Sequence, residues 1–150
     1  MSAKIFLFLI LLLSNHIQTA TNSFDYSKYT STSTNTDLSA QTLTSSTADQ
    51  SVVYITEKGK VISNSNLNKE SGDSSNTENS EFYGVNAAVL VNGGGLTMTG
   101  GTITTKAKGA NALCVTNNGE VSISETKITS TANSSGRGLH ATYGGKITAS

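Results

Sequence analysis

The sequence predicts an all-β protein, a right-handed parallel β-helix (solenoid) of about four coils with about 25 residues each. Three observations predict this fold. Short stretches in which apolar and polar residues alternate recur from residue 53 onward, and glycines recur with them at matching positions. Thr, Ser, Gly and Val are abundant, whereas the helix-forming residues Glu, Lys and Ala are few.

The first 20 residues are typical of a secretory signal peptide. Lys4 supplies a positive charge, residues 5–13 are an unbroken apolar run, and a polar stretch leads to Ala20, after which we expect cleavage. Nine apolar residues rise only about 14 Å as a helix, whereas a bilayer core is about 30 Å thick. The sequence therefore predicts a secreted or cell-surface protein with no transmembrane span.

Residues 21–50 form a Ser/Thr-rich, low-complexity segment with few side chains to bury, so we expect it to be disordered. One alternative is an O-glycosylated stalk, although such stalks usually contain Pro and this chain has none. In another, Phe24, Tyr26 and Tyr29 cover the end of the domain that follows.

From residue 53 onward the chain aligns with itself four times. Each repeat has a short apolar strand, a polar turn ending in glycine, and a second alternating strand. The aligned glycines are Gly59, Gly95, Gly119 and Gly145, separated by 36, 24 and 26 residues. A third apolar position follows at Leu67, Ile103 and Ile128. An antiparallel sandwich would explain the alternation but not the aligned glycines.

Alternation along each strand predicts which side chains face the interior. The first inward wall is expected to contain Val53, Val89, Leu113 and Leu139, with Ile55, Val91, Val115 and Ala141. The second is expected to contain Val61, Leu96, Val121 and Ile147, with Met98, Ile123 and Ala149. The outward rows are expected to be Thr97, Ser122 and Thr148, and Thr99, Ser124 and Ser150. We interpret these hydroxyls as ordinary outward residues rather than as an ice-binding array.

The β-helix repeats are expected over residues 51–150, with a polar surface loop inserted at 69–81 that lengthens one repeat. The final strand reaches Ser150 in the middle of a coil. The sequence therefore favours an N-terminal fragment of a longer protein. The alternative is that another molecule covers this end, as in end-to-end self-association.

Two stretches of the chain resemble the repeats of adhesin-like right-handed parallel β-helix proteins in the pectin-lyase-like superfamily. They are GVNAAVLVNGGGLTMTGGTITT at residues 84–105 and RGLHATYGGKITA at residues 137–149. The resemblance covers about residues 82–150 and weakens over 53–81. It implies a long extracellular β-helix that contacts polysaccharide or a surface, but it implies no particular activity, because this fold has many functions.

The acidic residues do not form a row on the predicted coils. Asp25, Asp37, Asp49 and Asp73 lie outside them, and the acids within them are Glu57, Glu120 and Glu125. Glycoside hydrolysis needs two carboxyl groups about 5–10 Å apart. We therefore expect no catalytic residues and no cofactor in this segment.

Two small clusters contain residue types that can bind metal ions. The acidic loop with Glu70, Asp73, Glu78 and Glu81 lacks the spacing of a tight calcium loop. Cys114 and His140 are expected at outward positions on adjacent coils, below Leu90, but two ligands do not complete a zinc shell. We expect no metal site. An outward Cys114 could instead pair with another molecule. Asn133 begins the N-x-S/T sequence and is a candidate N-glycosylation site.

Composition limits the function classes. Ten basic and ten acidic residues balance, so the chain has no basic surface for nucleic acid. The sequence favours a secreted or surface structural protein of the adhesin type, with polysaccharide or a cell surface as partner. The alternatives are a fragment of a polysaccharide lyase or glycoside hydrolase whose catalytic coils lie beyond residue 150, and a self-associating wall or sheath component.

Overall fold

The computed structural model describes residues 21–131 and 136–150. In these residues 14 strands form three sheets, and all of the paired strands are parallel. Sheet A contains β1 (Ser31–Thr34), β4 (Ser51–Ile55), β7 (Val89–Asn92), β10 (Leu113–Thr116) and β13 (Leu139–Ala141). Sheet B contains β2 (Leu38–Ser39), β5 (Lys60–Ser63), β8 (Gly95–Thr99), β11 (Glu120–Ser124) and β14 (Lys146–Ala149). Sheet C contains β3 (Thr42–Ser45), β6 (Asn66–Lys69), β9 (Thr102–Thr105) and β12 (Lys127–Ser130).

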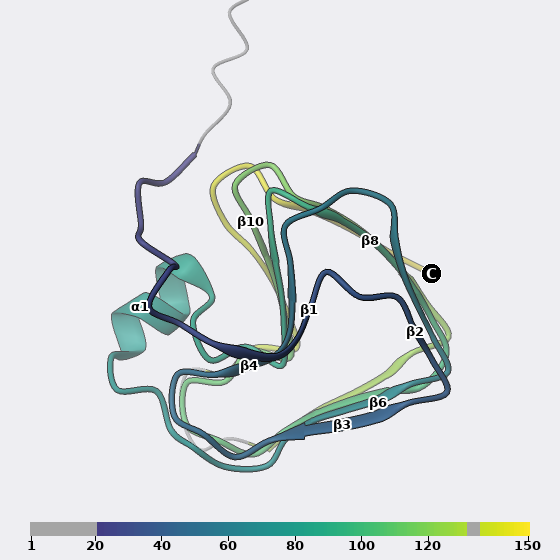
Figure 1. Cartoon of the computed structure of the whole chain (residues 1–150), viewed down its shortest axis with the longest axis horizontal. Helices are drawn as coiled ribbons and strands as arrows, with labels where there is room; N and C mark the ends of the chain where they lie inside the picture. The colour runs from purple at the N-terminus through teal and green to yellow at the C-terminus, as the bar shows by residue number, and fades with distance from the viewer. Residues whose placement is uncertain (1–20, 132–135) are drawn as a thin grey trace, which may run out of the picture.

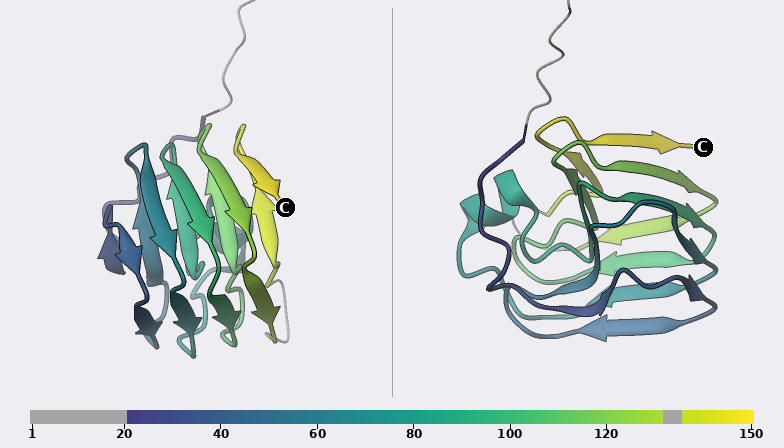
Figure 2. Two further views of the ribbon diagram at one scale, coloured as in Figure 1. Left: turned by 90° about the vertical axis from the view of Figure 1, so that its right-hand side faces the viewer. Right: turned by 45° about the horizontal axis from the view of Figure 1, so that its top comes forward.

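Every third strand returns to the same sheet, so each set of three strands makes one coil. Figure 1 looks along the stack, and Figure 2 shows the coils lying side by side. The all-β class and the parallel pairing that the sequence predicts are therefore confirmed, and this arrangement fits a parallel β-helix.

The interior is filled by columns of apolar side chains, one from each coil. In sheet A, Val53 pairs with Val89 and Val89 with Leu113, and these three residues are fully buried. In sheet C, the predicted third apolar position forms a column of Leu67, Ile103 and Ile128, extended by Leu43. Burial stabilises the fold by about 1.5–3 kcal/mol for each fully enclosed side chain.

The predicted inward orientation of Val61 is wrong. Val61 pairs with Thr97 on the outer face and is 47% exposed, whereas Ile62 pairs with Met98 inside and is fully buried. The inward position opposite Leu96 is occupied by Lys60, whose ammonium group turns back to Glu57 at 2.7 Å. Alignment of Gly59 with Gly95 predicts this register, in which Lys60 lies opposite Leu96. The apolar side chain of Val61 instead suggested a register shifted by one residue, with Val61 opposite Leu96.

Leu139 keeps the predicted register with Leu113 but is 42% exposed. Ala141 and Ala149, also predicted to face the interior, are exposed as well. The reason is that β13 and β14 each pair with only one strand among the described residues.

The Ser/Thr-rich segment is not a disordered leader. Residues 31–45 form β1, β2 and β3, which are the first coil of the stack. Ser33 occupies the inward position that Val53 and Val89 fill in the next two coils, and Ser31 is in register with Ser51; both serines are half-buried. Terminal coils of a solenoid need polar residues where they meet water, so small hydroxyl side chains are suited to this position.

The inserted stretch after β6 differs from the predicted loop in its second half. Helix α1 (Thr77–Tyr83) forms there. The Asn76 side chain caps its start by accepting from the amides of Glu78 and Asn79, and Gly84 ends it with φ of 74°. A helix of seven residues has no apolar periodicity long enough to be recognised in the sequence.

Candidate functional surfaces

The outer face of sheet A is covered by two other parts of the chain. One is α1, and the other is the N-terminal segment of residues 21–30, which we call the strap. Figure 1 shows both on the same side of the stack, while no other segment of residues 21–131 and 136–150 lies over the outer faces of sheets B and C. Among the described residues, the uncovered faces are therefore those of sheets B and C.

The strap is fixed by side chains rather than by strand pairing. The Asn22 backbone amide donates to Asn117 Oδ1 at 2.7 Å, and Asn22 Nδ2 donates to Thr116 Oγ1 at 3.3 Å. The Tyr26 hydroxyl donates to the Tyr83 carbonyl oxygen at 3.0 Å. These bonds reach α1, which precedes the third coil, and the fourth coil, so the strap runs across several coils.

All seven aromatic side chains of the described residues gather on this side in one connected cluster. Phe24 stacks on Tyr83 at 4.1 Å between ring centroids, and Tyr83 stacks on Tyr143 at 5.9 Å. The other contacts add Tyr26, Tyr29, Tyr54 and Phe82. One alternative from the sequence places the strap aromatics over the end of the following domain; they cover the side of sheet A instead.

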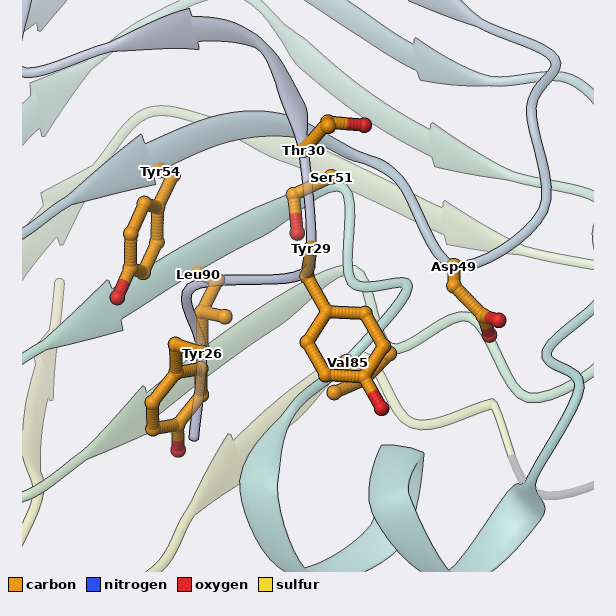
Figure 3. Close-up of a pocket in the computed structure, with 8 residues that line it drawn as sticks. All are labelled: Tyr26, Tyr29, Thr30, Asp49, Ser51, Tyr54, Val85 and Leu90. Atoms are coloured by element: carbon orange, nitrogen blue, oxygen red, sulfur yellow. The ribbon is translucent and has the colours of Figure 1, made fainter. Parts of the chain in front are cut away.

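A small cavity remains beneath the strap (Figure 3). It is lined by Tyr26, Tyr29, Thr30, Asp49, Ser51, Tyr54, Val85 and Leu90. Its volume of about 10 Å³ admits about one water molecule, so it is a packing gap and not a ligand site. Burial raises the pKa of Tyr26 to about 12 and also raises the pKa of Tyr54, so both phenols stay neutral at physiological pH.

Cys114 and His140 are neighbours in register, as predicted, and Leu90 lies on the other side of Cys114. The sequence predicts that both side chains point outward and are accessible, and for Cys114 the predicted accessibility is wrong. Cys114 is fully buried in a small cluster with Ala87 and Leu90, against which Tyr26 and Tyr54 pack. Burial raises the thiol pKa to about 12, so pairing with another molecule is blocked in this state. His140 Nε2 lies 2.6 Å from the Glu81 carbonyl oxygen.

The acidic residues of the inserted stretch are used separately. Glu70 pairs with Lys106 and Glu81 with Arg137, both at 2.5 Å, and Asp73 accepts from the Lys108 amide at 2.9 Å. In residues 21–131 and 136–150, no group of three or more His, Cys, Asp or Glu side chains is placed to hold a metal ion.

The outer face of sheet B is a wall of small hydroxyl side chains, interrupted by the exposed Val61 in the row of Thr97. Thr97 and Ser122 pair across adjacent coils, and Thr148 follows on the next coil. All three are exposed. The second row contains Ser63, Thr99 and Ser124, and Ser124 Oγ lies 3.4 Å from Thr99 Oγ1. The predicted outward positions of Thr97, Ser122 and Thr148, and of Thr99 and Ser124, are confirmed, and Ser63 extends the second row.

The outer face of sheet C continues this chemistry with amides. One row contains Thr42, Asn66, Thr102 and Lys127, and the other contains Thr44, Asn68, Thr104 and Thr129. Thr102 Oγ1 donates to Asn66 Oδ1 at 2.9 Å, so part of the first row is already satisfied within the wall. The alternation of residues in these strands predicts this face too, but only the apolar position of each strand was assigned from the sequence.

A shallow groove of about 240 Å³ crosses the start of sheet B. Its lining is Lys58, Gly59, Gly95, Leu96, Thr97, Glu120 and Ser122. Gly95 leaves space that a side chain would fill, and Lys58 Nζ is held near this space by the Gly94 carbonyl oxygen at 3.2 Å. The groove therefore combines one cation, one carboxylate, two hydroxyls and the apolar edge of Leu96.

No protein-family model matches the chain, and no curated protein or solved structure matches it either. The signal peptide expected at residues 1–20 and the glycosylation candidate Asn133 lie outside the described residues. Within those residues, no helix has the length and apolar character needed to span a membrane.

Proposed function

We propose that this chain is a secreted or cell-surface structural protein of the adhesin type, and that its free walls bind neutral polysaccharide. In this proposal it is a right-handed β-helix related to the pectin-lyase-like superfamily. This segment supplies adhesion and no catalysis. The observation that carries the proposal is the pair of uncovered walls on sheets B and C, which present hydroxyl and amide groups in regular rows.

The chemistry of these walls suits a neutral glycan. Outward rows of Thr, Ser and Asn offer donors and acceptors at the spacing of adjacent strands, about 4.8 Å. The groove at Gly95 adds Glu120, which can accept from sugar hydroxyls, and the apolar edge of Leu96. Glu120 lies in the groove with Lys58 and also pairs with Lys146 at 3.6 Å, and the lining of the groove has no row of basic side chains that would favour an acidic polysaccharide.

The binding test uses the purified chain and a panel of insoluble polysaccharides, neutral and acidic, in co-sedimentation. We expect retention on a neutral member and weak retention on acidic ones. Ser122→Tyr fills the groove and should reduce retention, whereas Ser71→Tyr, at an exposed position away from both walls, should not. Absence of retention on every polysaccharide would overturn the proposal.

A separate measurement tests secretion. The chain is expressed in a secretory host, and the N-terminus of the protein in the medium is determined by mass spectrometry. A mature N-terminus near Thr21 is the expected result. Retention of an intact residue 1–20 segment inside the cell would contradict the extracellular location.

A further inference from the structure

The strap is less buried than the surface it covers. Asn22, Phe24, Tyr26 and Tyr29 are half-buried, and the residues between them are exposed. Beneath them, Ala87 and Cys114 are fully buried and Leu90 is 4% exposed. Lifting the strap would therefore uncover an apolar floor without removing any strand from the three sheets.

The strap also lacks the contacts that hold the coils together. Neighbouring coils share ladders of backbone hydrogen bonds, whereas the hydrogen bonds of Asn22 and Tyr26 to the sheet A side all involve a side chain. The backbone of the strap joins a ladder only at its end, where the Ser51 amide donates to the Thr30 carbonyl oxygen at 3.1 Å. Segments with few buried contacts open at lower free energy than the core. The cavity in Figure 3 lies along this same boundary, so packing there is incomplete.

The partners of the strap lie far along the chain. Asn22 and Asn117 are 95 positions apart, and Tyr26 and Tyr83 are 57 apart. These partners come into place only when β7 and β10 have stacked. Contacts between positions so far apart require closure of a long loop, so they form late in folding.

We propose that the strap is a latch, which docks after the coils have stacked and opens before they separate. Its aromatic contacts extend the effect along the stack. Phe24 of the strap stacks on Tyr83 at the end of α1. Tyr83 in turn stacks on Tyr143, which lies in the last coil. A closed latch therefore adds contacts along the stack to those that α1 already makes with the last coil through Glu81 and Arg137. This inference concerns opening and stability, so it stands or falls independently of the proposed polysaccharide binding.

The chain contains a single cysteine, Cys114, whose labelling reports on opening of the covered face of sheet A. Tyr26 of the strap packs against the cluster that holds the thiol, and the Gly84 corner after α1 covers it as well, since a Cβ atom added there would lie 2.5 Å from Sγ. The experiment measures the rate at which a thiol reagent labels Cys114 in the full chain under native conditions, alongside the global unfolding rate from far-UV circular dichroism. We expect labelling to be faster than global unfolding and to depend only weakly on denaturant, because opening exposes little surface.

Phe24→Ala removes a ring that stacks on Tyr83 and should speed labelling at least about tenfold. Phe82→Ala is the matched control, because Phe82 is 51% exposed and contacts Tyr83 but no strap ring. It should leave the rate unchanged. Asn22→Ala is a milder second variant, which removes the donor to Thr116 and should speed labelling by a smaller factor.

Two outcomes would overturn the proposal. In one, labelling has the rate and denaturant dependence of global unfolding in every variant, so that the strap does not open separately. In the other, Arg137→Ala, which breaks the ion pair to Glu81 of α1, speeds labelling while Phe24→Ala and Asn22→Ala do not. The helix, and not the strap, would then be the moving cover.

Discussion

The ammonium group of Lys69 donates a hydrogen bond of 2.9 Å to the backbone carbonyl oxygen of Gln50, inside the corner that leads from β3 to β4. It also donates to the carbonyl oxygen of Thr47. Lys69 is fully buried and occupies the inward position between Ser45 and Thr105 in the stack. A cation therefore ties the first coil to the second at a point where other coils carry small hydroxyl residues.

Lys69 predicts a pH dependence of stability. Burial lowers its pKa from 10.5 to about 8, in opposition to Asp49 and Asp73, which raise it. Between these two values the unfolded chain binds the proton and the folded chain does not, so stability rises with pH. We expect a slope of at most about 1.4 kcal/mol per pH unit in the free energy of unfolding, measured with urea from pH 7 upward.

The control for this prediction is Lys69→Met. Cys114 and Tyr26 have raised pKa values in the folded state, about 12 each, so their ionisation in the unfolded chain lowers stability above pH 9. Both proteins share that loss, and the difference between their curves isolates Lys69. A constant difference across pH 7–10 would show that the Lys69 proton is equally held in both states.

Two glycines with nearly equal backbone angles should respond differently to the same substitution. Gly101 has φ of 76° and Gly59 has φ of 74°. A Cβ atom at Gly101 would meet the Ser65 carbonyl oxygen at 2.1 Å, whereas one at Gly59 would meet nothing within 4 Å. Gly59→Ala should cost about 1 kcal/mol of conformational strain. Gly101→Ala should cost several times more, as measured by chemical denaturation. Equal losses would mean that the corner at Gly101 has room to relax.

The sequence predicts the fold where residues repeat in type from coil to coil, and it fails where they do not. The parallel stacking followed from repeated glycines and from columns such as Leu67, Ile103 and Ile128, because a solenoid repeats its interior in every coil. The first coil was missed because its inward residues Ser31 and Ser33 carry no apolar signal. Polar composition is typical of both disorder and a terminal coil, and only pairing with β4 distinguishes them.

The covered face was the harder part to predict from sequence. The alternation of Asn22, Phe24 and Tyr26 suggests one half-buried side, but the hydrogen bonds of Asn22 and Tyr26 to α1 and the fourth coil reach partners 57 to 95 positions away along the chain. Nothing local specifies such contacts. Cys114 was placed correctly on the outer side of β10, yet its burial depends on α1 and the strap, which no repeat encodes.

The register of β5 gives a direct test through two adjacent residues. Ile62 is fully buried opposite Met98, and Val61 is 47% exposed opposite Thr97. Ile62→Thr should destabilise the protein by about 2–4 kcal/mol, because it removes apolar volume and buries a hydroxyl group. Val61→Thr should change stability by less than about 0.5 kcal/mol. A larger loss of stability for Val61→Thr than for Ile62→Thr in urea denaturation would mean that Val61, and not Ile62, faces the interior.

Leu38 tests whether the Ser/Thr-rich segment belongs to the folded stack. Its side chain is 8% exposed, it pairs in register with Ile62, and it belongs to the main core cluster. Leu38→Ala should therefore destabilise the protein by about 1–3 kcal/mol, below the usual range for a fully enclosed leucine because only one coil packs against it. Thr32→Ala, at an exposed position of β1, should have little effect.

Hydrogen exchange provides an independent measurement for the same coil. The Asn35 amide donates to the Tyr54 carbonyl oxygen and the Ala40 amide to the Ser63 carbonyl oxygen, both at 2.9 Å. Both amides should be protected well beyond the rate of an unstructured peptide, and Leu38→Ala should reduce that protection. The structure would be contradicted if both amides exchange at the unprotected rate and Leu38→Ala loses no stability. Residues 31–45 would then be a flexible leader and not a coil of the stack. Loss of protection in the variant alone would instead mean that one leucine holds an otherwise polar coil against the apolar core, because the serine and threonine side chains around it bury too little surface to do so.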